Sequence, residues 1–306
     1  MSTAALPRPI DPFLGSIAGR YEDDAVVVRR GDLRPGPGER WTAVTPHFTL
    51  GTTRGKLLVA HALTPGAVDN EVATVLAQEL FAPGWAAGSD TFERLLTGIV
   101  LSCHDDPVVA WELFYRASLK RLDDAATSGF APVYRRAETL IREAATRTLL
   151  DLGTCFGFLP LRVSDGAAGP DVAVRAADIS GPTCHLLGLI SARLARPVPV
   201  LVCDAAAVPL PDASVDTVTA LHLLEHLDAG RARAVLHEAM RLARRRVVIA
   251  VPLESEPDAV YGHVRTLDLA ALAATGEQAA TTGPWRPWVE EHHGGWLVLD
   301  RLLPPA

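Results

Sequence analysis

The chain lacks most features of secreted and membrane-spanning proteins. Its four cysteines, Cys103, Cys155, Cys184 and Cys203, include no C-x-x-C pair and are too few for a disulfide framework in 306 residues. We expect them to be reduced and mostly buried. No stretch is apolar enough to span a bilayer, and residues 1–19 lack the basic and apolar segments of a signal peptide. These absences predict a cytoplasmic protein with no membrane span.

An excess of positive charge is also missing. Lysine and arginine number 29 against 36 aspartates and glutamates, which leaves a net charge of -7. Proteins that wrap nucleic acid need the opposite balance, so we expect no nucleic-acid partner. The hydrophobic content of 48% and the charged content of 21% are those of an ordinary globular protein long enough for two modest domains.

The N-terminal half shows mostly helical periodicity. A turn-rich loop over residues 32–40 precedes two segments, 41–50 and 56–62, that we expect to pair as a hairpin. Helical patterns follow, over residues 68–81, 91–102, 107–124 and 133–145. These patterns predict a mostly helical accessory or substrate domain over residues 1–145.

One cluster in this half, Cys103 to Asp106, contains potential metal ligands. No second set of ligands lies at a recognisable spacing, and Asp105 and Asp106 directly precede Pro107 at the start of a predicted helix. An N-cap explains the acidic pair more simply. We therefore predict no metal site.

The C-terminal half has a different texture. Short apolar segments at 149–152, 172–177, 198–202, 217–221 and 247–251 alternate with helical stretches such as 229–242. This alternation is typical of βαβ units with a parallel sheet buried on both faces. Segments 288–291 and 296–302 flank a His-His-Gly-Gly turn and predict a terminal antiparallel hairpin. We assign residues 146–306 to an α/β domain.

A glycine-rich turn follows the first predicted strand of this domain. Gly153 and Gly157 lie four positions apart after Asp151, which departs from the G-x-G-x-x-G spacing of dinucleotide sites. Such a turn lets the backbone approach a nucleotide-like ligand, although a purely structural loop would look the same. A carboxylate at Asp151 favours a cofactor with a positive amino acid head over a pyrophosphate.

Acidic residues then recur after successive predicted strands. Asp178 lies 178 − 157 = 21 residues beyond Gly157, at the end of the second strand, where a carboxylate can accept ribose hydroxyls. A cap on the next turn is the alternative. Asp204 and the apolar Ala205 follow the third strand, where they could contact an adenine. The segment Leu224-Glu225-His226-Leu227 comes just after the fourth.

In this order and at these spacings the motifs resemble those of class I S-adenosylmethionine-dependent methyltransferases, over about residues 149–301. The resemblance implies a Rossmann-like seven-stranded sheet with an antiparallel last strand and S-adenosyl-L-methionine as cofactor. The cofactor-binding residues that it implies are Asp151, Gly153, Thr154, Cys155, Gly157, Asp178, Ile179, Asp204, Ala205 and Leu221. Cys155 departs from the family pattern, which has glycine there.

The segment after the fifth strand resembles that of methyltransferases acting on sugar hydroxyls and small polar metabolites, including those encoded with mycofactocin biosynthesis, which modify the oligosaccharide of that redox cofactor. The expected acceptor is a small molecule or an oligosaccharide. A hydroxyl acceptor needs a base, and histidine suits this task. The candidates are His222 and His263, followed by His226. Tyr261, Arg265 and His292 are candidate substrate contacts.

Two other classes stay open on sequence grounds. A catalytically silent nucleotide-binding or scaffold protein would explain Cys155. A nicotinamide-dependent oxidoreductase would share the doubly wound sheet, although the missing dinucleotide fingerprint counts against it. The sequence leaves the oligomeric state open.

Overall fold

The computed structural model describes residues 10–31, 34, 36–124 and 128–302. Within these ranges the contacts divide the chain into two compact units. The first contains residues 1–123 and 259–261, and the second contains 124–258 and 262–306. Residues 32, 33 and 35 of the expected loop lie outside the described residues.

The first unit holds a five-stranded sheet as well as helices, with strand order β1-β2-β5-β4-β3. Its strands are β1 (Arg20–Glu22), β2 (Val26–Arg30), β3 (Glu39–Val44), β4 (Phe48–Thr53) and β5 (Lys56–His61). Its helices are η1 (Pro65–Ala67), α1 (Val72–Leu76), the π-helical η2 (Ala77–Phe81), α2 (Ser89–Leu101) and α3 (Pro107–Asp123). The expected hairpin corresponds to β4 with β5, but its expected first segment, 41–50, is divided between β3 and β4, which pair with each other. The sheet is also larger than that hairpin because the short β1 and β2 carry no clear alternating pattern.

The acidic pair before α3 forms the cap that the sequence predicts. One carboxylate oxygen of Asp106 accepts the backbone N–H groups of Val108 at 2.8 Å and Val109 at 3.3 Å. Cys103 is buried and points its thiol at the carbonyl of Ile99. The four cysteines are free thiols, with Cys155 exposed and Cys103 and Cys184 buried.

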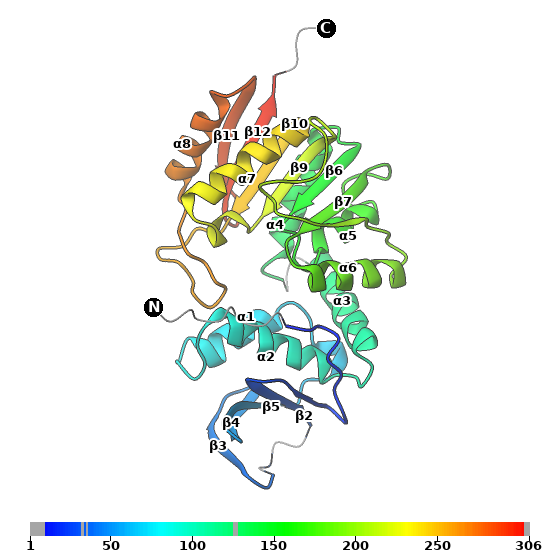
Figure 1. Ribbon diagram of the computed structural model, residues 1–306, viewed down its shortest axis with the longest axis vertical. Helices are drawn as coiled ribbons and strands as arrows, with labels where there is room; N and C mark the ends of the chain where they lie inside the picture. The colour runs from blue at the N-terminus through cyan, green and yellow to red at the C-terminus, as the bar shows by residue number, and fades with distance from the viewer. Residues whose placement is uncertain (1–9, 32–33, 35, 125–127, 303–306) are drawn as a thin grey trace. The chain divides into compact units, whose positions relative to one another are not determined.

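The second unit is a seven-stranded sheet of order β11-β12-β10-β9-β6-β7-β8 (Figure 1). Its strands are β6 (Thr148–Leu152), β7 (Ala173–Asp178), β8 (Val200–Val202), β9 (Val215–Leu221), β10 (Ala243–Val251), β11 (Trp285–Glu291) and β12 (Gly295–Arg301). Its helices are α4 (Ala131–Glu143), α5 (Phe158–Ser164), α6 (Gly181–Arg193), η3 (Leu224–His226), α7 (Ala229–Leu242) and α8 (Leu269–Ala280).

Only the last strand of this sheet is reversed. β6, β7, β8, β9 and β10 pair in parallel, whereas β12 runs antiparallel to both β10 and β11. This is the Rossmann-like sheet with an antiparallel last strand that the sequence predicts. Its central strands read as continuous apolar segments because helices cover them, with α7 and α8 packed on the face toward the viewer in Figure 1.

Helix α4 packs with the second unit, although the sequence analysis ended the N-terminal domain at residue 145. Arg136 on this helix forms a bidentate ion pair with Glu290 of β11, at 2.5 and 2.9 Å. Glu138 pairs with Arg162 of α5 at 2.5 Å, and both side chains are buried. These bonds join α4 to elements that lie far away in the sequence.

Candidate cofactor and active site

The expected cofactor residues lie at one edge of the seven-stranded sheet. Because β6 to β10 are parallel, their carboxyl ends meet at that edge, and the loops that follow them carry the motifs. This is where open α/β sheets bind ligands, at the point where the strand order reverses between β6 and β9.

The turn after β6 requires its glycines. Gly153 has φ +63° and Gly157 has φ +68°, both in the left-handed region. A Cβ atom at Gly153 would lie 2.7 Å from Leu223 Cδ1, and one at Gly157 would lie 2.5 Å from Leu187 Cδ2. A side chain at either position would strain the backbone and displace a leucine, so glycine is favoured at both.

Asp151 is buried beneath this turn. Its two carboxylate oxygens accept hydrogen bonds from the hydroxyls of Thr219 at 2.6 Å and Thr154 at 2.8 Å. Burial raises the pKa of Asp151 to about 6, and the hydroxyls offset part of that effect. The carboxylate thus holds the turn to the neighbouring strand β9.

Cys155 occupies the turn with an unusual backbone. Its φ of 49° is left-handed, which costs a residue with a Cβ atom strain that glycine avoids. The side chain is exposed, and the backbone N–H donates to Asp178 Oδ2 at 2.9 Å. The cysteine is therefore tolerated because its side chain meets solvent and its amide anchors the turn.

Asp178 joins the turn to the end of β7. Its second oxygen accepts the N–H of Ser180 at 2.9 Å, so the predicted cap and the predicted ligand position coincide. A carboxylate offers about four lone-pair positions, which leaves acceptor capacity beside these two bonds. The next residue, Ile179, is 71% exposed, an apolar surface beside a polar carboxylate.

Asp204 has a partner that the sequence analysis did not anticipate. Its Oδ1 accepts the N–H of Ala206 at 2.9 Å, and its Oδ2 accepts from Arg231 of α7 at 2.7 Å. The Ala206 amide and then the Arg231 guanidinium hold the pKa of Asp204 below its usual value. Ala205 beside it is half-buried.

The loop after β9 brings a histidine beside a buried carboxylate. Leu221 is the half-buried last residue of β9. His222 follows with φ 52°, and its N–H donates to the carbonyl of Ala250 on β10 at 2.8 Å. Its Nδ1 lies 3.3 Å from Oε1 of Glu225, whose side chain is 2% exposed. The histidine side chain itself is 32% exposed, so it can meet both Glu225 and a ligand.

His226 and His263 form a second group beside it. Their rings are 4.9 Å apart and nearly perpendicular, at 80°. Nδ1 of His263 lies 2.9 and 3.1 Å from the two carboxylate oxygens of Glu254. The His226 residue is exposed as a whole. Partial burial of its imidazole nevertheless lowers the pKa of the ring.

The expected substrate contacts belong to different units of the chain. Tyr261 belongs to the first unit, where its ring packs edge-on against Phe92 at 5.2 Å. Arg265 is half-buried in the loop that precedes α8, and Asp268 caps that helix by accepting the N–H of Ala271. His292 is exposed at the turn between β11 and β12.

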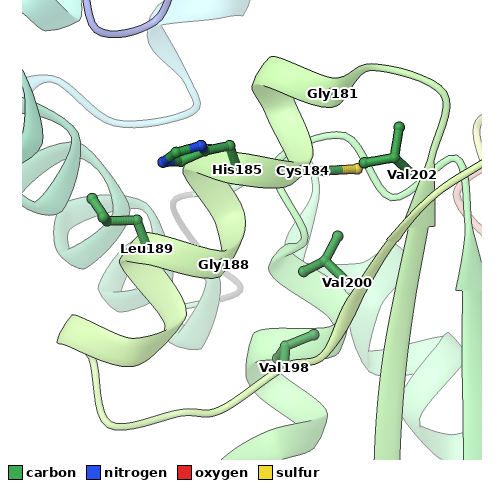
Figure 2. Close-up of a pocket in the computed structure, with 8 residues that line it drawn as sticks. All are labelled: Gly181, Cys184, His185, Gly188, Leu189, Val198, Val200 and Val202. Atoms are coloured by element: carbon green, nitrogen blue, oxygen red, sulfur yellow. The ribbon is translucent and has the colours of Figure 1, made fainter.

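Two hollows lie in the second unit. One of about 420 Å³ contains His292, and its other lining residues are Pro132, Arg135, Arg136, Thr139 and His293. The other, of about 560 Å³, lies between α6 and β8 and is lined mainly by apolar residues (Figure 2). The lining of this second hollow includes none of the predicted site residues.

Sequence reasoning missed Tyr134, Glu225 and Arg231 as site residues. Tyr134 lies on α4, and burial, followed by the negative charges of Cys155 and Asp151, raises the pKa of its phenol. Glu225 lies inside the Leu224-Glu225-His226-Leu227 motif, but nothing in the sequence reveals that its carboxylate is buried. Tyr134 lies 151 − 134 = 17 positions before Asp151, and Arg231 lies 231 − 204 = 27 positions after Asp204, so only the packing of α4 and α7 brings them there.

Comparisons with known proteins agree with this architecture. Residues 150–251 match the family model of a methyltransferase domain, a segment that runs from within β6 to the end of β10 and includes the glycine turn, Asp178, Asp204 and His222. No curated protein matches the chain. Among the described residues, no helix is long and apolar enough to cross a membrane.

Several solved structures are similar. A SAM-dependent methyltransferase from Aquifex aeolicus is 21% identical with a TM-score of 0.43, over 60% of this chain and 95% of that one. Magnesium protoporphyrin IX methyltransferase from Synechocystis PCC 6803 with bound SAM is 15% identical with a TM-score of 0.45, over 59% and 84%. An O-methyltransferase family protein from Burkholderia thailandensis is 15% identical with a TM-score of 0.46, over 63% and 62%.

Proposed function

We propose that the second unit is an S-adenosylmethionine-dependent methyltransferase that methylates a hydroxyl of a small polar acceptor. One observation carries the proposal. The glycine turn, Asp178, Asp204 and His222 follow four different strands and meet at one edge of the sheet, within the segment that matches the methyltransferase domain. The same match and the missing dinucleotide fingerprint favour methyl transfer over hydride transfer to nicotinamide.

The residues at this edge fit the parts of S-adenosylmethionine. The left-handed turn around Gly153 would hold the methionine moiety with its backbone, and glycine suits this turn because a Cβ atom there would lie 2.7 Å from Leu223 Cδ1. Asp178 retains acceptor capacity for ribose hydroxyls, and the exposed Ile179 offers apolar surface to the adenine. Asp204 can accept the adenine amino group only if it shares its carboxylate with Arg231.

When bound, the cofactor supplies a methyl group on a positively charged sulfur, which is a good leaving group. The chain has to align the acceptor oxygen, exclude water and remove a proton. His222 suits the last task because Glu225 lies at its Nδ1, which leaves Nε2 to accept the hydroxyl proton. The lower exposure of the His263 side chain, 8%, and its bond to Glu254 favour His222 over His263 as the base.

The acceptor class is the finer part of the proposal. The hollow that contains His292 carries arginine, threonine and histidine side chains, whose polar groups can bind the hydroxyl groups of an acceptor. A sugar hydroxyl fits this lining, and the mycofactocin oligosaccharide is the specific acceptor that the sequence resemblance suggests. Residues 1–145 remain a predicted accessory or substrate domain.

Binding comes first in the test. Calorimetry with S-adenosylmethionine and its demethylated product measures affinity for the native chain, for Asp178→Ala and for a matched control, Asp171→Ala, whose side chain is 73% exposed. We expect binding to weaken at least about 10-fold in Asp178→Ala, which loses charge-assisted hydrogen bonds to the ribose. No heat with either ligand would refute the proposal.

Turnover comes second. Incubation with cofactor labelled at the methyl group and with oligosaccharides, including that of mycofactocin, would identify the product by mass. We expect His222→Gln to lower turnover about 100-fold to 10,000-fold because it removes the base, while cofactor affinity stays unchanged. Labelling of an amine or a thiol in place of a hydroxyl would contradict the acceptor class. Cofactor binding without transfer to any acceptor would favour the scaffold alternative.

A further inference from the structure

We propose that Glu225, His226 and His263 form a binding site for a divalent transition-metal ion. Each residue offers one ligand atom, and these atoms lie within 4.8 Å of one another. Glu225 and His226 belong to the turn η3 after β9, and His263 belongs to the loop between β10 and α8. Residues 38 positions apart thus bring two imidazoles and one carboxylate together.

The surroundings of the Glu225 carboxylate suit a metal ligand. The residue is 1% exposed, and both of its carboxylate oxygens are buried without a hydrogen-bond partner. A buried carboxylate is costly unless a positive charge or hydrogen bonds compensate it. Nδ1 of His222 lies 3.3 Å away without hydrogen-bond geometry, and it compensates only if that imidazole is protonated. A bound dication would coordinate one oxygen and compensate the charge of the carboxylate.

Two neighbouring interactions orient His263 and its loop for metal binding. Glu254 lies 2.9 Å from Nδ1 of His263, an arrangement that fixes the ring and leaves Nε2 as the coordinating atom. Carboxylate–histidine pairs of this kind support most metal-bound histidines. The N–H of Val264 donates to the carbonyl of Glu225 at 2.9 Å, which ties the two ligand-bearing loops together.

The ligand set selects the class of metal. Two imidazoles and one carboxylate suit Zn²⁺, Fe²⁺, Mn²⁺ or Co²⁺ and leave coordination positions open, whereas Ca²⁺ and Mg²⁺ prefer oxygen ligands alone. His226 is exposed, so an ion has a route from solvent. This site has no recognisable ligand spacing in the sequence, because its three ligands come from two separate loops.

The open positions bear on catalysis, and this part rests on the proposed function. Metal-bound water and hydroxyl groups lose a proton more easily than free ones. An acceptor hydroxyl at an open position would therefore give up its proton more readily to His222. Metal binding itself is measured without cofactor or acceptor, so its result stands whether or not methyl transfer is found.

The test is a metal titration of the full chain after removal of bound ions with a chelator. We expect Zn²⁺ to bind in one equivalent by calorimetry, and Co²⁺ to give a visible absorption band typical of few-coordinate nitrogen and oxygen ligands. Glu225→Gln and His263→Ala should weaken binding at least 10-fold, and Glu254→Gln about 10-fold to 100-fold through its supporting role. His237→Ala, a histidine of α7 outside the cluster, is the matched control and should bind as the native chain does.

Folding of the variants is checked by thermal unfolding without metal. We expect Glu225→Gln to unfold at the same or a higher temperature, since it removes an unpaired buried charge. Native protein that binds neither Zn²⁺ nor Co²⁺ would overturn the site. Native-like binding by Glu225→Gln, or equal loss of binding in His237→Ala, would also overturn it.

Discussion

Replacing Asp151 by asparagine is expected to stabilise the protein at neutral pH, and less so as the pH falls. Asp151 is 4% exposed, and burial raises its pKa from 3.8 to about 6. Between these pH values the unfolded state has lost the proton that the folded state keeps. Stability therefore falls as the pH rises through this window, and the full cost is present above about pH 6.

The size of this cost follows from the two pKa values. A difference of about 2 between them corresponds to a loss of about 3 kcal/mol of folding stability, and about 2 kcal/mol of this loss develops between pH 4.5 and pH 8. Asparagine has nearly the same shape and no charge to desolvate, and the hydroxyls of Thr154 and Thr219 can reorient to donate or accept. The stability gain of Asp151→Asn should grow by this amount between the two pH values.

The assay is urea unfolding of the full chain at pH 4.5 and pH 8, followed by circular dichroism. Asp171→Asn is the matched control, because its side chain is 73% exposed and the substitution should change stability by less than about 0.5 kcal/mol at either pH. A stability difference between Asp151→Asn and the native chain that does not vary with pH would refute the reasoning. It would mean that Asp151 stays ionised in the folded state across this range.

Three further predictions concern the turn and its support. Cys155→Gly should raise the free energy of unfolding by about 1 kcal/mol, because its φ of 49° suits glycine; denaturant unfolding measures this, and a loss of stability would contradict it. Gly157→Ala should cost about 1–3 kcal/mol and weaken cofactor binding, since its Cβ would lie 2.5 Å from Leu187; unchanged calorimetry and melting temperature would count against it. Arg162→Met should cost about 3–5 kcal/mol in urea unfolding, because it leaves Glu138 buried without its partner; a native-like midpoint would argue that the pair is unimportant.

Much of the second unit could be predicted from sequence because its signals are local. Continuous apolar segments predicted five of the strands, since a sheet covered on both faces leaves no polar alternation, and the His-His-Gly-Gly turn predicted the final hairpin. The glycines of the turn were equally readable, because left-handed backbone and close packing exclude a Cβ atom. The sheet of the first unit was harder, because its β1 is only three residues long and β2 pairs in parallel with the distant β5.

In the candidate site, too, local features could be predicted from the sequence and distant contacts could not. Asp178 and Asp204 were placed by their distance from a strand end, a quantity that the sequence contains. The partners of these residues could not be predicted from the sequence, because Arg231 approaches Asp204 only when α7 packs beside β9. The packing of helix α4 with the second unit could not be predicted for a similar reason, since its ion pair with Glu290 spans 154 positions.

By itself, then, the sequence determined the order of elements, the turn that admits a nucleotide-like cofactor and the carboxylates at the strand ends. These depend on backbone sterics and hydrophobic periodicity, which act over a few residues. Tertiary structure alone decided which side chains are desolvated and what they meet. It buried Glu225 without a hydrogen-bond partner and brought His263 to His226 from another loop. Charge and metal affinity depend on such distances in space, so they arise only when the chain has folded.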